Sequence, residues 1–350
     1  MIQSMPSTIQ ESIARENLSI EVTTRCTSNC SYCFVRAGRT QYYELDYKTV
    51  FSVISEGYKI GYRHLHITGG EPLLWKHLFD IMNDAVATGY ESILLNTNGL
   101  LLSNKTAHQL ASIKGINLSI SLQGFQTIHD TFRGYSSFVE TTHGIEMALQ
   151  YDIPVYLYTV IGRSLLPQLP HFVHWAFEKF TGLKEITLIQ LIYVPGAVGN
   201  IYNELLSPDD FLSLVNMISL LGLYGFPVTL LENPLATVVA HMLQLPWFSN
   251  PPQLIRPGRL TIMADRSINI AHSSRQSLGV YSAGKLHHVL SSEDYWGAVG
   301  EDTITCASCD YRALCHKAGM QRPTENFRYM YDDVPYCKRV IVGAHRYTSL

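Results

Sequence analysis

The sequence predicts an α/β fold in which parallel strands alternate with helices. Runs rich in β-forming residues alternate with helical periodicity over the first two thirds of the 350-residue chain. The composition, 46% hydrophobic and 16% charged, is that of a folded globular protein. The unusual glycine and polar motifs follow predicted strands. Periodicity alone leaves two closures open, a doubly wound sheet or a barrel, complete or partial.

Six strand–helix units follow one another, and this order predicts parallel strands joined by right-handed crossovers. The predicted strands are Leu18–Thr23, His64–Thr68, Ser92–Thr97, Asn117–Leu122, Pro154–Ile161 and Glu185–Ile192. The predicted helices are Tyr47–Ile60, Lys76–Thr88, Asn104–Ile113, Phe138–Gln150, Leu169–Phe180 and Pro208–Leu221. The last of these helices begins at a start signal, Ser207 followed by a proline at the first helical position.

The motifs share one predicted face of the sheet. Cys26 follows the first strand, and the sequence GGEP at 69–72 follows the second. NTNG at 96–99 follows the third strand, and SLQG at 121–124 follows the fourth. Because parallel strands all end at the same edge, we expect the chemistry of the protein at their carboxyl ends. Glycines there are expected to let the backbone approach a cofactor closely.

Charge and hydropathy exclude several classes of function. Lysine and arginine number 26 against 29 acidic residues, a net charge of −3, so generic binding to nucleic acid is not expected. The most apolar segment, Met217–Leu231, is interrupted by serine, glycine and proline, which argues against a membrane span. The N-terminus carries charged residues and no apolar signal segment. The chain is therefore expected to be soluble and cytoplasmic.

Seven cysteines fall into two groups, three near the start and four near the end, with none from residue 34 to residue 305. An odd number in a chain without an export signal argues against a disulfide framework. Thiols that serve as small core residues would be scattered. The grouping therefore predicts two metal sites.

The first group, Cys26, Cys30 and Cys33, has the spacing C-x3-C-x2-C. Closely spaced thiolates suit an iron–sulfur cube, because one short loop must wrap a compact inorganic core. Three ligands for four irons would leave one iron open to another ligand. The alternative is a zinc site that takes its fourth ligand from elsewhere, such as His64 or His66.

These residues resemble the radical S-adenosylmethionine (SAM) superfamily, whose signature is this cysteine spacing with an aromatic residue, here Tyr32, before the third cysteine. The second family element is the GGEP-like motif, here beginning Gly69, Gly70 and Glu71, which in the family holds the SAM amino group. The resemblance implies a partial (β/α)6 TIM-like barrel with a small irregular C-terminal iron–sulfur domain. It also implies a [4Fe-4S] cluster that binds SAM.

Further positions match the family less specifically. Asn98, Ser121, Arg133 and Val194 are expected among the SAM contacts, the serine at the fourth strand and the arginine commonly meeting the ribose or carboxylate. Val194 lies in a Pro-Gly turn that resembles the loop closing over the adenosine. The sequence departs from the commoner pattern at Gln123, where many peptide-modifying relatives carry aspartate.

The second group, Cys306, Cys309, Cys315 and Cys337, has the spacing C-x2-C-x5-C-x21-C and can ligate either zinc or a four-iron cluster. It resembles the SPASM extension of radical SAM enzymes, which carries auxiliary clusters. Gly319 stands at the family's next cysteine position, and no cysteine occurs from 256 to 305. The resemblance therefore implies one auxiliary [4Fe-4S] cluster, with His272 as a candidate substitute ligand or a structural histidine.

The resemblance implies an enzyme that cleaves SAM reductively to a 5′-deoxyadenosyl radical and abstracts a hydrogen atom from a substrate C–H bond. A peptide or protein is the expected substrate, modified by cross-linking, epimerisation or oxidation, and a flavodoxin or ferredoxin is the expected reductant. The absence of a leader-binding domain before Cys26 weakens the peptide interpretation. The alternatives are a small-molecule substrate (a sugar, nucleoside or tetrapyrrole) and a non-catalytic zinc-binding interaction module.

The domain organisation follows from these assignments. Residues 1–17 form an N-terminal segment, 18–250 the radical SAM barrel and 251–350 the auxiliary-cluster domain. Within the last of these, Leu260–Met263 and Ser267–Ala271 predict a small hairpin. Regular periodicity fades after Tyr281, so an irregular, metal-supported region is expected there.

Overall fold

The computed structural model describes residues 17–33, 35, 41–192, 201–231, 233–249, 257–272, 277–300, 309–315 and 334–348. Within these residues, one nine-stranded sheet runs in the order β7-β6-β5-β4-β3-β2-β1-β8-β9. The first seven strands are parallel and each pairs with the next in sequence: β1 (Asn17–Glu21), β2 (His64–Thr68), β3 (Ser92–Thr97), β4 (Ile116–Ser121), β5 (Val155–Ile161), β6 (Glu185–Gln190) and β7 (Val228–Leu230).

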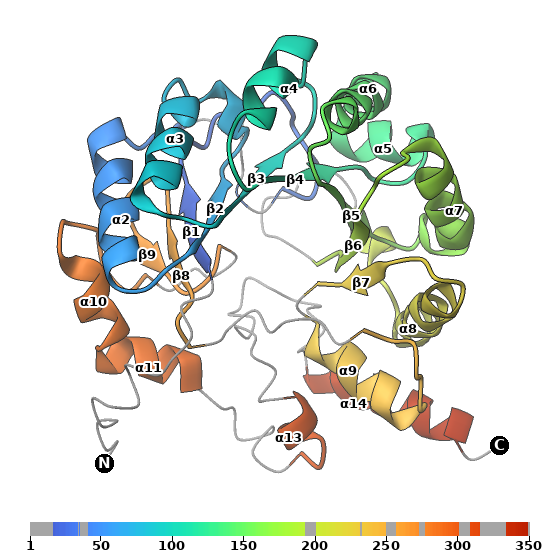
Figure 1. Cartoon of the computed structure of the whole chain (residues 1–350). Helices are drawn as coiled ribbons and strands as arrows, with labels where there is room; N and C mark the ends of the chain where they lie inside the picture. Colours follow the sequence, from blue (N-terminus) through green and yellow to red (C-terminus); the bar gives the residue numbers. More distant parts are fainter. Residues whose placement is uncertain are drawn as a thin grey trace.

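The sheet is curved, and the helices that follow β1 to β6 lie on its outer side, as Figure 1 shows. The predicted partial TIM-like barrel is therefore confirmed, and the doubly wound alternative is wrong because the described helices that follow β1 to β6 all lie on one face of the sheet. The outer helices are α2 (Tyr47–Lys59), α3 (Leu78–Thr88), α4 (Asn104–Ala111), α5 (Gln126–Arg133), α6 (Ser137–Gln150), α7 (Leu169–Lys179) and α8 (Pro208–Leu223). Three short 3-10 helices are η1 (Pro72–Leu74), η2 (Leu166–Gln168) and η3 (Ile201–Glu204).

Side chains alternate in polarity along the strands. The helix-facing positions are apolar and almost fully buried, and each contributes about 1.5–3 kcal/mol by leaving water: Leu18, Ile20, Leu65, Ile67, Ile93, Leu95, Leu118, Ile120, Val155 and Leu157. The alternate positions, which face the interior of the barrel, are largely polar: Ser19, Glu21, His66, Asn96 and Ser119. Some of these pair across strands, as where Ser19 Oγ lies 3.2 Å from His66 Nδ1. The interior is thus suited to polar ligands.

The predicted helix starts are explained by their caps. Asp46 caps α2 by accepting the Thr49 N–H at 2.8 Å. Ser207 and Asp210 form a reciprocal capping box at the start of α8, with Pro208 at the first helical position as predicted. These contacts fix the entry of each helix at the carboxyl edge of the sheet.

The predicted hairpin is confirmed, and it extends the barrel sheet. β8 (Leu260–Ile262) runs parallel to β1, while β9 (Ile268–Asn269) is antiparallel to β8. At the opposite edge, β7 adds a parallel strand that the six predicted strand–helix units did not include. This strand was missed because it has three residues inside a longer apolar segment.

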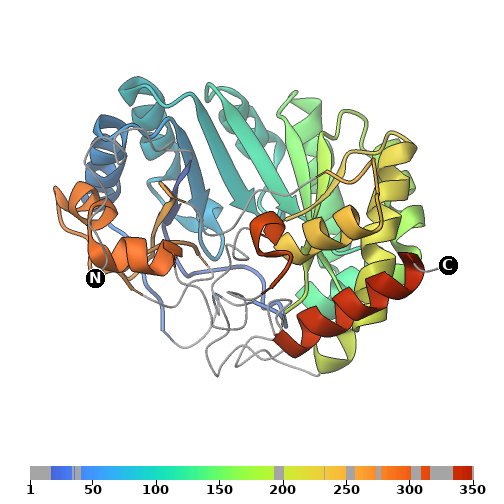
Figure 2. The same cartoon turned by 90° about the horizontal axis from the view of Figure 1, so that it is seen from below.

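Regular structure also continues where irregular chain was predicted. The unpredicted helices are α5, α9 (Pro234–Met242), α10 (Lys285–Leu290), α11 (Glu293–Gly300), α13 (Arg312–Cys315) and α14 (Val334–Thr348). Most have nine residues or fewer, too short for helical periodicity to mark them. The last helix packs against α8 and α9, as Figure 2 shows. The prediction of an irregular region is therefore wrong for 285–300 and 334–348, and the domain boundary at 250 stays a prediction. No helix within the described residues is both long and apolar enough to span a membrane.

Candidate cofactor site

The loop that carries Cys26, Cys30 and Cys33 leaves the carboxyl end of β1 and is held there by the loop after β2. The Gly70 N–H donates to the Thr23 carbonyl at 2.7 Å, and the Glu71 N–H donates to the Arg25 carbonyl at 2.7 Å. A Cβ at Gly69 would lie 2.5 Å from the Thr23 carbonyl oxygen, and one at Gly70 would overlap that of Arg25. The two glycines therefore allow the loop after β2 to lie close to the backbone of the cysteine loop. The sequence had not indicated this contact.

Glu71 joins the loop after β2 to the end of β3. Its carboxylate is fully buried and accepts hydrogen bonds from the Asn98 N–H at 2.8 Å, from Thr97 Oγ1 at 2.9 Å and from the Leu73 N–H at 3.2 Å. Burial raises the pKa of Glu71 above its ordinary value, and the three donors oppose this by stabilising the carboxylate. The side chain thus braces two neighbouring strand ends.

Asn98 connects the end of β3 to the cysteine loop. Its Nδ2 donates to Thr27 Oγ1 at 2.8 Å and to Ser28 Oγ at 3.2 Å, and it lies 3.8 Å from Cys26 Sγ. The Ser28 N–H also points at this sulfur, at 3.4 Å. Two N–H groups therefore face Cys26 Sγ and would stabilise a ligating thiolate.

The thiol chemistry of the loop fits an iron–sulfur cluster. Burial raises the pKa of Cys26 to about 11, so the unligated thiol is protonated and a metal must displace that proton. The Cys33 N–H donates to the Cys30 carbonyl at 3.2 Å, which turns the loop between the second and third thiols. Among the described residues, no three His, Cys, Asp or Glu side chains converge enough to hold a single ion. Thiolates on a cube each bind a different iron and need not meet at one point.

Tyr32 docks the cysteine loop against α5. Arg133 Nη1 donates to Tyr32 Oη at 2.9 Å, and the Tyr32 and Phe132 ring centroids are 5.8 Å apart. The Ser31 N–H donates to the Phe132 carbonyl at 2.9 Å. Burial raises the pKa of Tyr32, so the phenol stays neutral. The structure thus brings together Tyr32 and Arg133, which lie 101 residues apart in the sequence.

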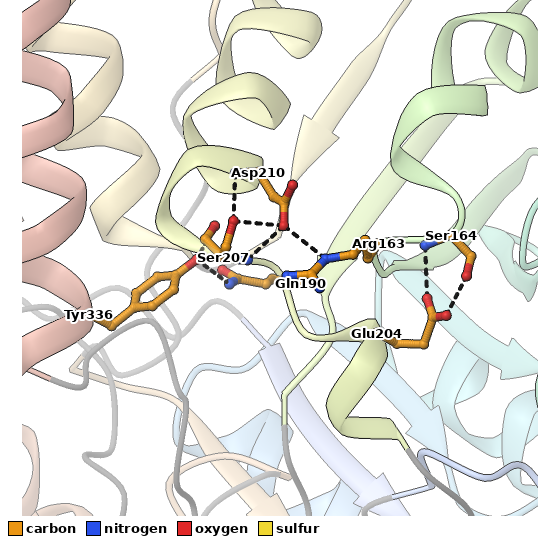
Figure 3. Close-up of polar contacts among 7 residues, drawn as sticks. All are labelled: Arg163, Ser164, Gln190, Glu204, Ser207, Asp210 and Tyr336. Carbon is orange, nitrogen blue, oxygen red and sulfur yellow. Dashed lines mark hydrogen bonds and ion pairs between the residues drawn. The ribbon is translucent and has the colours of Figure 1, made fainter.

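A small pocket opens beside Tyr32. Most of its lining is apolar, and the acidic Glu204 lies at its margin; the remaining lining residues are Ile128, Phe132, Val160, Gly162, Leu165 and Leu191. The Glu204 carboxylate accepts hydrogen bonds from the N–H and Oγ of Ser164, as Figure 3 shows. The pocket therefore lies at the ends of β5 and β6, and most of its walls are apolar.

Hydrogen bonds of two residues near Arg133 attach α5 to the loop after β4 and to the start of α6. The backbone N–H of Gln123 donates to His129 Nδ1 at 3.1 Å, and burial lowers the pKa of His129 to about 3. The imidazole is therefore neutral and carries its proton on Nε2. Asp130 accepts the Phe138 N–H at 2.8 Å, which ties α5 to the start of α6.

Gln123 has a structural role of its own. Its Oε1 accepts the Val160 N–H at 2.6 Å, and its Nε2 lies 3.4 Å from the Tyr158 carbonyl. The amide thus joins β4 to β5 with both a donor and an acceptor, which an aspartate cannot supply. Ser121 ends β4 and pairs in register with Tyr158. Val194 lies outside the described residues.

The part of the chain that carries these residues matches a known protein family. The family profile described as "Radical SAM superfamily" matches residues 20–174. Residues 20–174 therefore resemble a radical SAM domain. The matched segment contains the end of β1, all of β2 to β5, the three cysteines and the brace formed by Glu71 and Asn98. The match to this family, together with relatives named as cyclases, indicates an enzyme.

One curated relative is the probable GTP 3′,8-cyclase of Saccharolobus solfataricus, 30% identical over 182 residues that cover 50% of this chain and 57% of that protein. The match spans less than two thirds of the relative's length. Among solved structures, native anSMEcpe with bound AdoMet superposes with a TM-score of 0.74 at 17% identity, covering 95% of this chain and 97% of that one.

Streptococcus suis SuiB bound to its precursor peptide SuiA superposes with a TM-score of 0.68 at 16% identity, covering 87% of this chain and 71% of that one. Another structure of anSMEcpe holds a Cp18Cys peptide. At these sequence identities, the similarity to both proteins shows a shared fold and no more.

Outside the radical SAM domain, three of the four C-terminal cysteines are described, and Cys306 lies outside the described residues. Cys315 ends α13, and Cys337 lies in the first turns of α14; both helices pack against α9. Tyr311 Oη lies 3.3 Å from His345 Nε2 and links the two helices. Cys315 and Cys337 pack against the hydrophobic core. The structure thus gathers the helices that carry these thiols.

The histidines considered as metal ligands each contact a polar side chain of a neighbouring strand. His272 Nε2 pairs with Glu21 Oε2 at 2.5 Å, at the end of β1. His64 Nδ1 lies 2.8 Å from Ser92 Oγ, and His66 pairs with Ser19, all within the strands. These contacts occupy one ring nitrogen of each histidine with a neighbouring strand or loop.

Proposed function

We propose that this protein cleaves SAM reductively at a [4Fe-4S] cluster held by Cys26, Cys30 and Cys33 and abstracts a hydrogen atom from a peptide or protein substrate. The observation that carries the proposal is the set of hydrogen bonds that joins the cysteine loop, the GGEP loop and the end of β3 at one edge of the barrel. The bound cluster would supply the electron that breaks a carbon–sulfur bond of SAM.

The protein's part is to position the cofactor and exclude water. Gly69, Gly70 and Glu71 hold the loop edge where the SAM amino group is expected, and Asn98 steadies Cys26. The apolar residues beside Tyr32 would contact the adenine. Ser121, Arg133 and Val194 are the remaining proposed SAM contacts.

We propose that Cys306, Cys309, Cys315 and Cys337 hold one auxiliary [4Fe-4S] cluster. Support comes from the packing of α13 and α14 on the same helix, α9, and from the contact between Tyr311 and His345. A flavodoxin or ferredoxin is the proposed reductant. We propose a cytoplasmic location, because reduced iron–sulfur clusters need a reducing compartment.

A peptide substrate is supported by the fold, since SuiB and anSMEcpe superpose on most of this chain and have structures with bound peptides. A nucleotide is the second candidate, because the sequence match over half the chain is to proteins named probable GTP 3′,8-cyclase. The polar interior of the barrel is compatible with either substrate.

Anaerobic reconstitution tests the proposal. The wild type should bind about eight irons per chain and release 5′-deoxyadenosine from SAM under dithionite. Replacing Cys26, Cys30 and Cys33 together with alanine should abolish the release, whereas Cys309→Ala should preserve it. Colourless protein with stoichiometric zinc would refute the proposal in favour of a zinc-binding module. Deuterium transfer into 5′-deoxyadenosine from labelled peptide or labelled GTP identifies the substrate class.

A further inference from the structure

Three buried polar side chains meet where β6 ends. Gln190, Asn233 and Tyr336 are each at most 4% exposed. We call them the Gln190 junction. Gln190 is the last residue of β6, Asn233 is the N-cap of α9, and Tyr336 lies in the first turn of α14. The junction therefore joins one strand of the barrel to two helices from later in the chain.

Hydrogen bonds run through the junction in series. Asn233 Nδ2 donates to Gln190 Oε1 at 2.7 Å, and Gln190 Nε2 donates to Tyr336 Oη at 3.3 Å. The Tyr336 hydroxyl then donates to the Ser207 carbonyl at 3.4 Å, at the start of α8. Figure 3 shows Tyr336 reaching Gln190 and Ser207, with Asp210 and Arg163 continuing the polar contacts toward the end of β5.

Each element at the junction leads to a proposed cofactor site. Leu191, next to Gln190, lines the pocket beside Tyr32. α9, which Asn233 caps, packs against α13, and α13 ends at Cys315. Tyr336 immediately precedes Cys337. The hydrogen bonds of the Gln190 junction thus join the strand next to the pocket beside Tyr32 with α9 and with the start of α14, the helix that carries Cys337.

The energetics of burial make this connection rigid. A buried amide or hydroxyl is stable only when it is hydrogen-bonded, and losing one member leaves its partners unsatisfied. The Tyr336 ring is also held by Phe211 of α8, with centroids 6.1 Å apart in an edge-on arrangement. The start of α14 therefore has one preferred position against the barrel.

We propose that Tyr336 is a positioning residue that fixes Cys337, and through Gln190 and Asn233 the helix that supports Cys315, relative to the SAM edge of the barrel. This inference rests on the proposed auxiliary cluster. The Tyr336 hydroxyl is held by an amide N–H and a backbone carbonyl, neither of which takes up a proton. Oxidation of a phenol requires its proton to leave, so the role assigned to Tyr336 is structural positioning and not electron relay.

The test measures the auxiliary cluster alone. In a background with Cys26, Cys30 and Cys33 replaced by alanine, only auxiliary iron is counted, about four irons per chain. Tyr336→Phe keeps the ring and removes the hydroxyl, and Gln190→Met removes the amide. We expect each to speed iron release to a chelator by about 5- to 20-fold, the effect of losing one buried hydrogen bond. The EPR signal of the reduced auxiliary cluster should broaden in both variants.

Tyr295→Phe is the matched control. The Tyr295 hydroxyl is equally buried and accepts the Gly258 N–H at 2.7 Å, ahead of β8 and away from β6. Its loss should lower stability without changing iron release. Equal release rates for all three variants would overturn the inference and leave the auxiliary cluster intact. A background protein without iron would refute the auxiliary cluster and the inference together. If Tyr336→Phe does not fold, Gln190→Met decides the question.

Discussion

The loop that carries Cys26 and the helices that carry Cys315 and Cys337 are attached to the barrel by different kinds of contact. The first is fastened by backbone hydrogen bonds from Gly70 and Glu71 and by side-chain bonds from Asn98. The second packs on α9 and α8 through apolar side chains, and its polar attachment among the described residues is made at Tyr336, which meets Gln190 and Ser207. We expect the first site to be formed before its cofactor arrives and the second to gain more order from its metal.

Separate removal of the two sets of thiols should give the largest contrast. Cys26→Ala, Cys30→Ala and Cys33→Ala together should eliminate 5′-deoxyadenosine release, because no other described cysteines adjoin the GGEP loop. Cys315→Ala with Cys337→Ala should lose auxiliary iron and productive turnover but keep substrate-independent SAM cleavage. Chromatography of quenched reactions measures both. Loss of SAM cleavage in the second variant would contradict the independence of the two sites.

Gly70→Ala tests the fastening of the first region. The new Cβ would overlap the Arg25 carbonyl, so the cysteine loop must shift and the free energy of unfolding should fall by about 2–3 kcal/mol. Gly297→Ala is the control, because nothing lies within 4 Å of its Cβ position in α11. That change should be neutral or add about 0.5–1 kcal/mol. Urea unfolding measures both, and equal effects would show that the close approach is unimportant.

Acid should weaken the scaffold of the first region through His129. Its pKa is lowered from 6.5 to about 3 by burial, so below pH 6.5 the unfolded chain takes up a proton that the folded chain refuses. Stability is therefore lost as the pH falls from 6.5 toward 3, by roughly 1 kcal/mol per pH unit. His129→Asn keeps an acceptor for the Gln123 N–H and should flatten this dependence. Urea unfolding at about pH 5 and about pH 7 compares the wild type with His129→Asn. The same loss of stability at the lower pH in both proteins would refute the prediction.

The smallest effect is expected at Gln123. Gln123→Asp shortens the side chain and removes the donor that faces the Tyr158 carbonyl, so the free energy of unfolding should fall by about 1 kcal/mol. Gln123→Glu keeps the length, and it replaces the donor with a carboxylate oxygen that faces the Tyr158 carbonyl. Thermal melting compares the two variants, and auxiliary iron release should be unchanged in both. An unchanged melting temperature for Gln123→Asp would mean that the amide does not stabilise the joint between β4 and β5.

The sequence predicted the parallel strands and the grouping of motifs at their carboxyl ends, because short motifs after apolar runs are local patterns. It could not predict that Glu71 would contact Asn98 or that Tyr32 would contact Arg133, since these pairs lie 27 and 101 residues apart. Asn98 was expected to contact SAM, and its bonds to Thr27 and Ser28 are what the structure adds.

Other parts escaped prediction for physical reasons. β7 has three residues and α13 has four, so neither repeats its pattern often enough to be recognised. α14 was hidden because it contains Cys337 and follows a turn-rich stretch that indicated irregular structure. Gln190, Asn233 and Tyr336 carry no motif, and only the folded chain brings them together.

The pairing of β1 with β8 has a consequence for biosynthesis. Leu18 lies in register with Leu260, so the strand that leads into Cys26 acquires its second neighbour only after most of the polypeptide has left the ribosome. Until then, β1 is an exposed edge with unpaired amide groups, open to association with other chains. We therefore expect iron and sulfide to be inserted after translation, when β8 has paired with β1.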